Sequence, residues 1–282
     1  MPLLASSRRR ITLIASALVI CTAAAALPAL TAAADAAVIP RSALPAVRYV
    51  ALGDSYSSGV GSGDYYRSGG SCERSPGAYP ALWAAASHPA SYVSEACSGA
   101  TIGSVLRSQL VALNKATTLV SITIGGNDVG FGPVMSTCVI LATSFCAHVV
   151  TAAEAEIRSV LPGRLNELLA AVSAAAPEAR VVVMGYPEPY DLSRSASCIG
   201  LSTTDRNDLD QAAAQLDAQL QAAADRYSDA FADVRSVFGG HQICDSESWM
   251  NSVDWLDIGA SYHPNPAGQA DAYYQVFSAA AR

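Results

Sequence analysis

Short continuous runs of apolar residues recur along the chain at intervals that suit buried parallel strands. The clear runs lie at residues 49–52, 119–124, 181–184 and 230–234, and a weaker one lies at 91–95. The segments between them carry apolar residues at helical spacing. Strands that alternate with helices predict a three-layer α/β/α sandwich around a parallel sheet of about five strands.

Two of the intervening segments have a clear helical pattern. One includes Ile157, Leu161, Leu165, Leu168 and Val172, and the other includes Leu209, Leu216, Leu220, Ala223 and Tyr227. Pro162 predicts a kink or break in the first helix, and Ser202 with Asp205 resembles a capping box for the second. We expect loops at 57–75 and 131–148, where Gly, Pro and Ser are frequent, and a terminal helix at 267–277.

The N-terminus is typical of an export signal. Arg8, Arg9 and Arg10 precede an apolar run at 11–30, and Ala34-Asp35-Ala36 offers a cleavage site between small residues. A transmembrane anchor is the alternative, but no basic cluster follows the run. We therefore expect a signal peptide at 1–36, no stable membrane anchor, and one secreted domain at 37–282.

Charge and cysteine content narrow the class of protein. Loss of residues 1–36 changes the formal net charge from −7 to −9, and this acidity argues against a nucleic-acid partner. Six cysteines remain, an even number that favours disulfides in an exported protein. Fifteen pairings are possible, and proximity along the chain favours Cys72–Cys97 and Cys138–Cys146, which leaves Cys198–Cys244. No C-x-x-C motif is present, so we expect no zinc and no other cofactor.

Small polar motifs follow two of the predicted strands directly. Residues 49–52 run into Gly53-Asp54-Ser55, and residues 119–124 run into Gly125-Gly126-Asn127. Ligand sites of open parallel sheets form at the carboxyl ends of the strands. A serine nucleophile needs a base and donors for the oxyanion, and Asn127 can be one such donor. Asp54 is expected to stabilise the turn rather than to take part in proton transfer.

His263 is the best candidate for the base among the four histidines. It lies in the loop Ser261-Tyr262-His263-Pro264 just before the predicted terminal helix. His88, His148 and His241 have no comparable context. An ordinary α/β-hydrolase is excluded because the chain contains no G-x-S-x-G motif.

These motifs together resemble those of the GDSL/SGNH hydrolase family, and most of all its secreted actinobacterial branch of esterases and lipases. Gly53-Asp54-Ser55 is similar to the first block of the family, and Ala96-Cys97-Ser98-Gly99-Ala100 is similar to the second. Gly125-Gly126-Asn127-Asp128 resembles the third block, and His263-Pro264-Asn265 resembles the fifth. The resemblance implies a flavodoxin-like fold, with Ser55 as nucleophile and His263 as base. It also implies an oxyanion hole made by the backbone N–H groups of Ser55 and Gly99 with the Asn127 side chain, and the three sequential disulfides.

The chain departs from the family pattern at Ala260, three residues before the histidine, where many members have an aspartate. Either a backbone carbonyl near Ala260 orients His263, or a more distant acid, Asp257 or Asp254, does so. We favour the carbonyl, because it can fix the tautomer of the imidazole without ionising.

The resulting hypothesis is a secreted, monomeric esterase or lipase that cleaves lipid or other small carboxylic esters through an acyl-serine intermediate. A polysaccharide O-acetylesterase of the same family would use the same residues on a smaller acyl group. Acyl transfer to an acceptor other than water would use the same acyl-serine. A non-catalytic protein that binds the cell wall is the hypothesis from a different class.

Overall fold

The computed structural model describes residues 46–141, 143–198 and 200–282. The expected signal peptide at 1–36 lies outside the described residues. Within them, five parallel strands form one sheet in the order β2-β1-β3-β4-β5. The strands are β1 (Arg48–Gly53), β2 (Ser91–Ser94), β3 (Leu119–Thr123), β4 (Arg180–Met184) and β5 (Ala230–Ala232). The expected number and positions of the strands are confirmed, and the order is the flavodoxin-like one.

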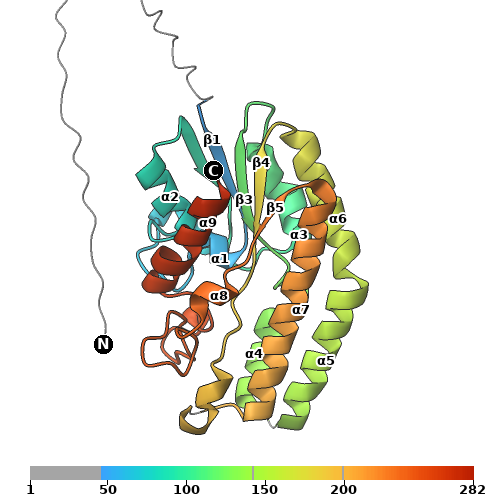
Figure 1. The fold of residues 1–282 in the computed structure, drawn as a ribbon, viewed down its shortest axis with the longest axis vertical. Helices are drawn as coiled ribbons and strands as arrows, with labels where there is room; N and C mark the ends of the chain where they lie inside the picture. Colours follow the sequence, from blue (N-terminus) through green and yellow to red (C-terminus); the bar gives the residue numbers. More distant parts are fainter. Residues whose placement is uncertain (1–45, 142, 199) are drawn as a thin grey trace, which may run out of the picture. The chain divides into compact units, whose positions relative to one another are not determined.

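Helices cover both faces of this sheet (Figure 1). The α-helices are α1 (Ser55–Ser58), α2 (Tyr79–Ser87), α3 (Ile102–Ser104), α4 (Phe131–Ile140), α5 (Thr143–Ser159), α6 (Leu161–Ala175), α7 (Thr203–Tyr227), α8 (Arg235–Phe238) and α9 (Tyr274–Ala280). Short 3₁₀ segments are η1 (Arg67–Cys72), η3 (Leu110–Ala112), η4 (Leu192–Ser197) and η5 (Ile258–Ala260), and π-helical turns are η2 (Val105–Gln109) and η6 (Gly268–Tyr273). Helices α2 and α9 pack on one face of the sheet, and α6 and α7 pack on the other.

The central strands β1, β3 and β4 are buried because they are largely apolar on both sides. All residues of β1 after Arg48 and all residues of β3 are buried, as parallel sheets covered by helices require. Tyr49 illustrates the packing, since its ring stacks on Phe277 of α9 and meets Trp83 of α2 edge-on. Burial of such large side chains supplies most of the driving force for folding.

Most described residues of the segment 131–148 are helical, and our expectation of a loop there was wrong. Helix α4 lies in it and α5 begins in it, the two helices form an antiparallel pair, and Cys138–Cys146 joins them. Pro133 is tolerated because it lies in the first turn of α4, where its missing N–H is not needed. Pro162 lies in the first turn of α6 and marks the break between α5 and α6.

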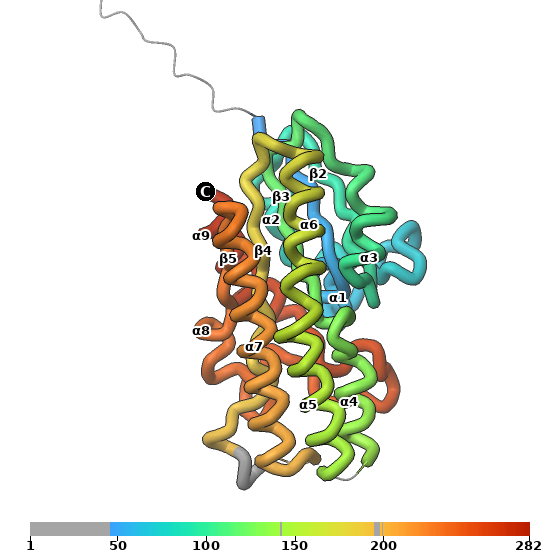
Figure 2. The backbone as a smooth tube through the Cα atoms, turned by 90° about the vertical axis from the view of Figure 1, so that its right-hand side faces the viewer, coloured from blue at the N-terminus to red at the C-terminus, as the bar shows by residue number. Residues whose placement is uncertain are grey.

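The pair α4–α5 and the first half of α7 extend beyond the carboxyl ends of the strands (Figure 2). Ser202 caps α7 as expected, because its hydroxyl accepts a hydrogen bond from the Asp205 N–H. These three helices therefore form a wall at the edge of the sheet where the candidate residues Ser55 and Asn127 lie. None of the helices in the described ranges is long and apolar enough to cross a bilayer.

Candidate active site

Ser55 lies at the start of α1, directly after β1. The turn between them depends on Gly53, whose φ of +118° is unfavourable for other residues and whose added Cβ would lie 2.2 Å from the Thr123 carbonyl oxygen. The Gln109 side chain accepts a hydrogen bond from the Gly53 N–H at 2.7 Å and donates one to the Gly53 carbonyl at 2.9 Å. The position of Ser55 is therefore fixed by the sheet and by a buried amide.

The Asp54 carboxyl holds the same turn from the other side. It accepts hydrogen bonds from the Tyr56 N–H, the Thr123 hydroxyl and the Tyr186 hydroxyl. Burial raises the pKa of Asp54 to about 6, and these hydrogen bonds oppose part of the rise. Among the described residues it makes no hydrogen bond to Ser55 or His263, in line with the structural role expected for it.

His263 is brought to Ser55 from the far end of the chain. Its Nε2 lies 2.8 Å from the Ser55 Oγ, and its Nδ1 lies 3.0 Å from the Ser261 carbonyl oxygen. Because a carbonyl can only accept, Nδ1 carries the proton and Nε2 is free to accept the proton of the Ser55 hydroxyl. The two side chains thus have the geometry of a nucleophile and its base.

No carboxylate contacts the His263 ring among the described residues. Asp254 accepts hydrogen bonds from the N–H groups of Leu256 and Asp257, and Asp257 accepts one from the Ala260 N–H. Both acids are thus engaged within their own loop. The group that the structure places at Nδ1 is the Ser261 carbonyl, one residue after Ala260.

The environment of His263 favours its neutral form. Burial lowers the pKa of His263 from 6.5 to about 4, although hydrogen bonding to the Ser261, Gly259 and Ala260 backbone opposes this effect. The imidazole is therefore uncharged at neutral pH, which is the state that a general base requires.

We call residues 251–263 the histidine loop, and contacts at both of its ends hold it against the nucleophile turn. The Tyr56 hydroxyl donates to the Tyr262 carbonyl at 2.7 Å, and the Asn251 side chain donates to the Gly61 carbonyl at 3.1 Å. Gly61 is required where the two segments cross, since an added Cβ would lie 2.9 Å from the His263 Cβ. Beyond the loop, the Gln269 side chain donates to the Tyr56 carbonyl at 3.0 Å.

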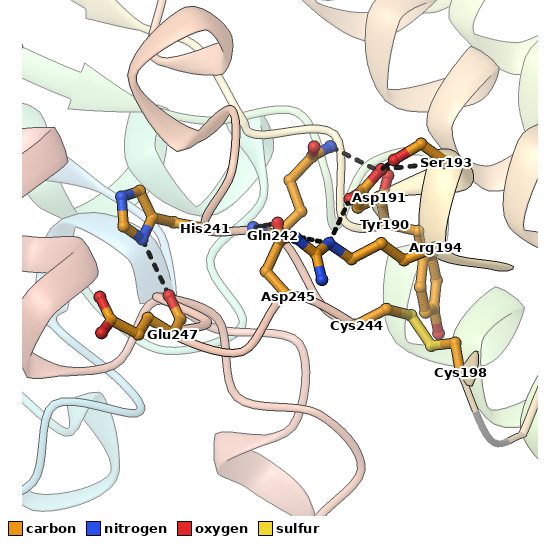
Figure 3. Close-up of polar contacts among 10 residues, drawn as sticks. All are labelled: Tyr190, Asp191, Ser193, Arg194, Cys198, His241, Gln242, Cys244, Asp245 and Glu247. Carbon is orange, nitrogen blue, oxygen red and sulfur yellow. Dashed lines mark hydrogen bonds and ion pairs between the residues drawn. A yellow bond between two sulfur atoms is a disulfide. The ribbon is translucent and has the colours of Figure 1, made fainter.

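The segment before the histidine loop is anchored to the chain that leaves β4 (Figure 3). The Gln242 side chain donates to the carbonyls of Glu188 and Tyr190, both at 3.0 Å. Arg194 of η4 forms an ion pair with Asp245 at 3.0 Å, and Cys198–Cys244 joins the same two segments. Together these contacts fix the entry to the histidine loop.

Three N–H donors, from Ser55, Gly99 and Asn127, belong to residues that line the groove at the Ser55 hydroxyl. The backbone N–H groups of Ser55 and Gly99 donate to no described residue. The Asn127 side chain donates one N–H to the Ala100 carbonyl at 3.0 Å, which leaves its second N–H available. Ser55, Gly99 and Asn127 line one groove together with His263. Disulfide Cys72–Cys97 restrains the turn that carries Gly99.

Comparison with known proteins identifies the family of the chain. The model of the GDSL-like lipase/acylhydrolase family matches residues 51–270, which include Ser55, Gly99, Asn127 and His263. The chain belongs to the GDSL-like lipase/acylhydrolase family. It is therefore a lipase or esterase, that is, a carboxylic ester hydrolase.

Three similar proteins are lipolytic enzymes of Streptomyces. Lipase 1 of Streptomyces coelicolor is 49% identical over 233 residues, which span 83% of this chain and 86% of that lipase. The crystal structure of phospholipase A1 from Streptomyces albidoflavus NA297 has a TM-score of 0.82 at 48% identity and covers 84% of this chain. That of the extracellular lipase from Streptomyces rimosus has a TM-score of 0.80 at 46% identity and covers 83%. Both of those chains are covered completely.

Two cavities of this GDSL-family enzyme meet at Ser55. One, which we call the channel, is a cavity of about 80 Å³ between the strand ends and helices α4, α5 and α7, and its walls are mostly apolar. Its lining includes Met135, Ala153, Ile157, Ala213 and Leu216. The other is an open groove of about 350 Å³ that contains His263 and runs between α4 and the histidine loop. The acyl and alcohol groups of an ester bound at Ser55 can therefore occupy two different cavities.

The remaining candidates lie elsewhere. His88 and His148 are exposed, and His241 stacks on Trp249 and hydrogen-bonds to the Glu247 carbonyl. Within the described ranges, no group of three or more His, Cys, Asp or Glu side chains could hold a metal ion. Sequence reasoning missed Gln109, Tyr186 and Gln269, because only the fold shows that their polar groups reach the nucleophile turn.

Proposed function

We propose that the enzyme is secreted and hydrolyses lipid esters through an acyl-serine intermediate, with Ser55 as nucleophile and His263 as general base. The observation that carries this proposal is the pair of hydrogen bonds from Ser55 Oγ to His263 Nε2 and from His263 Nδ1 to the Ser261 carbonyl. A catalytic dyad oriented by a backbone carbonyl follows from it, with no part for Asp254 or Asp257.

The reaction has two halves of similar chemistry. The Ser55 Oγ attacks the ester carbonyl carbon while His263 Nε2 takes the hydroxyl proton, and the negative charge on the carbonyl oxygen is held by the N–H groups of Ser55, Gly99 and Asn127. The tetrahedral intermediate then expels the alcohol, which takes the proton from Nε2. Water repeats the attack on the acyl-serine and releases the acid.

The channel supports a lipid acyl chain as the group that is transferred. Helices α4, α5 and α7 supply apolar side chains along it, and an unbranched hydrocarbon gains free energy for each methylene group that it buries there. An acetyl group would contact only a few of these apolar side chains, which argues against a polysaccharide O-acetylesterase. The relatives named lipase and phospholipase A1 support the same assignment.

Secretion and a monomeric state complete the proposal. Three disulfides, Cys72–Cys97, Cys138–Cys146 and Cys198–Cys244, favour an oxidising compartment. The relative from Streptomyces rimosus is described as extracellular. We expect no nucleic-acid partner, no cofactor and no membrane anchor.

Replacement of the nucleophile tests the assignment of the site. We expect Ser55→Ala to lower kcat for p-nitrophenyl butyrate by at least about 10⁴-fold, because the acyl-serine can no longer form. Circular dichroism and the unfolding midpoint should match those of the parent enzyme. Ser58→Ala, a buried serine of the same helix, is the matched control and should retain activity. Retention of activity by Ser55→Ala would exclude it as the nucleophile.

Filling the channel tests the assignment of the acyl chain. Ala153 lines the channel, whereas its neighbour Ala152 on α5 is exposed. We expect Ala153→Phe to lower the ratio of kcat/KM for octanoate to that for acetate esters by about tenfold or more, since several methylene groups lose their site. Ala152→Phe should leave the ratio unchanged. An unchanged ratio in a folded Ala153→Phe variant would place the acyl chain elsewhere.

A further inference from the structure

Large apolar side chains are exposed on two segments that flank the catalytic groove. At the end of α4, Ile140 is 67% and Leu141 is 51% exposed. In the histidine loop, Trp255 is 71%, Leu256 is 100% and Ile258 is 63% exposed. Single exposed apolar residues are common on protein surfaces, but a group of them beside a binding site marks an interaction surface.

These five residues, which we call the apolar rim, lie around one opening. Ile140, Trp255 and Ile258 line the groove that contains Ser55 and His263. Leu141 and Trp255 line an adjoining cavity of about 600 Å³, and Leu256 follows Trp255 directly. The rim is thus continuous with the groove into which the substrate must pass.

Covalent and polar contacts hold both segments in this exposed arrangement. Disulfide Cys138–Cys146 joins α5 to the last turns of α4, next to Ile140 and Leu141. In the histidine loop, the Asp254 carboxylate accepts hydrogen bonds from the Leu256 and Asp257 N–H groups at 2.8 Å and 3.2 Å. The apolar side chains therefore project from braced turns, so little conformational entropy is lost when they enter an apolar phase.

The charges near the rim indicate which surface it fits. Residues 131–157 and 246–263 contain no Lys or Arg, while Asp254 and Asp257 lie within the rim itself. An anionic membrane attracts proteins through Lys and Arg near its surface, and the two segments that carry the rim contain neither. The rim therefore suits a lipid surface that is uncharged or zwitterionic.

We propose that the apolar rim docks on the surface of aggregated, uncharged or zwitterionic ester lipid and so places the groove against its substrate. The inference rests on the proposed function, because it assumes that the substrate is a lipid. Each rim side chain that leaves water for the acyl region adds to the binding free energy. The lipid then needs to move only a short distance from its own phase to Ser55.

Direct binding is measured with Ser55→Ala enzyme, which cannot consume the vesicles. We expect this variant to partition onto phosphatidylcholine vesicles in a flotation assay. Trp255 emission should shift to the blue on binding, since the other two tryptophans, Trp83 and Trp249, are at least partly buried. Adding Leu141→Ser and Leu256→Ser should weaken partitioning by about tenfold or more. Equal partitioning of the two proteins would overturn the inference.

Val111→Ser in the same background is the matched control. Val111 is 81% exposed in η3 and lines neither the cavities at Ser55 nor the cavity beside the rim. It should leave partitioning unchanged. All of the variants are prepared in the same way, so any contribution of the N-terminal segment is common to them.

A comparison of substrates separates this inference from the proposed function. With Ser55 intact, the Leu141→Ser/Leu256→Ser enzyme should hydrolyse dissolved p-nitrophenyl butyrate at the parent rate but phosphatidylcholine vesicles about tenfold more slowly. Equal losses on both substrates would overturn the docking role and leave the esterase assignment intact. If Ser55→Ala instead hydrolysed both substrates at the parent rate, the proposed function itself would be wrong.

Two further outcomes would overturn the choice of partner. Stronger partitioning onto vesicles that contain phosphatidylglycerol would contradict the preference for an uncharged or zwitterionic surface. A dimer in sedimentation that dissociates in the Leu141→Ser/Leu256→Ser variant would identify the rim as a contact between two copies of the chain. We expect a monomer for both proteins.

Discussion

The nucleophile turn and the histidine loop meet at one hydrogen bond, yet they are built in different ways. Ser55 and its neighbours in α1 are buried. The Gln109 side chain accepts a hydrogen bond from the Gly53 N–H of their turn, and the Tyr186 hydroxyl donates one to the Asp54 carboxyl. Most of the histidine loop is exposed, and backbone hydrogen bonds between Asn251 and both Tyr262 and His263 close it. The sheet thus fixes the nucleophile, whereas local loop geometry orients the base.

Removal of the buried Gln109 amide tests most strongly whether the nucleophile turn depends on buried side chains. We expect Gln109→Ala to lower the free energy of unfolding by about 1–3 kcal/mol, because the buried Gly53 N–H loses its acceptor. Urea denaturation measures the change. Ser108→Ala, at the exposed neighbouring residue, should change stability by less than about 0.5 kcal/mol. Equal effects of the two substitutions would show that the turn does not depend on Gln109.

The pH dependence of kcat/KM tests whether burial lowers the pKa of His263, the general base. Neutral imidazole is the active form, so activity is lost as pH falls through the pKa of His263, which burial lowers to about 4. At pH 5 the enzyme should retain about 90% of its plateau value, whereas a base with the ordinary pKa of 6.5 would retain about 3%. Circular dichroism at pH 5 checks that the fold is intact. An acid limb centred near 6.5 would contradict the burial of His263.

Substitution of the two acids of the histidine loop should have the smallest effect. Asp254 and Asp257 accept hydrogen bonds from backbone N–H groups and leave Nδ1 of His263 to the Ser261 carbonyl. We expect Asp254→Asn and Asp257→Asn each to change kcat by less than about threefold, since a true triad acid costs about 10⁴-fold when replaced by asparagine. A loss of 10³-fold or more in either variant would replace the dyad with a triad.

Much of the fold was predictable because buried parallel strands leave continuous apolar runs in the sequence. The helical pair α4–α5 was missed, since Gly132, Pro133 and several β-branched residues have low helix propensity. Four residues at helical spacing are buried along α5, namely Cys146, Val150, Ala153 and Ile157. This spacing indicates an amphipathic helix and outweighs the low helix propensity of single residues. Packing and a disulfide hold the pair where local preference alone does not.

The same division applies to the site. Ser55 and His263 could be chosen from the sequence, because their motifs follow a strand and precede a helix. The supporting groups could not, because Gln109, Tyr186 and Gln269 lie in segments without a motif and act through contacts that only the folded chain creates. The acceptor of Nδ1 was likewise open between a carbonyl and an acid, and backbone geometry places the Ser261 carbonyl there.

A double-substitution cycle tests the central claim, that Ser55 and His263 act as one unit. The kcat of Ser55→Ala, His263→Ala and the double variant is measured on p-nitrophenyl butyrate, with unfolding curves to confirm that each is folded. Because the base has no function without the nucleophile, we predict that the double variant is no slower than Ser55→Ala alone, within about threefold. Losses that multiply, or a His263→Ala enzyme that keeps its activity, would contradict the dyad.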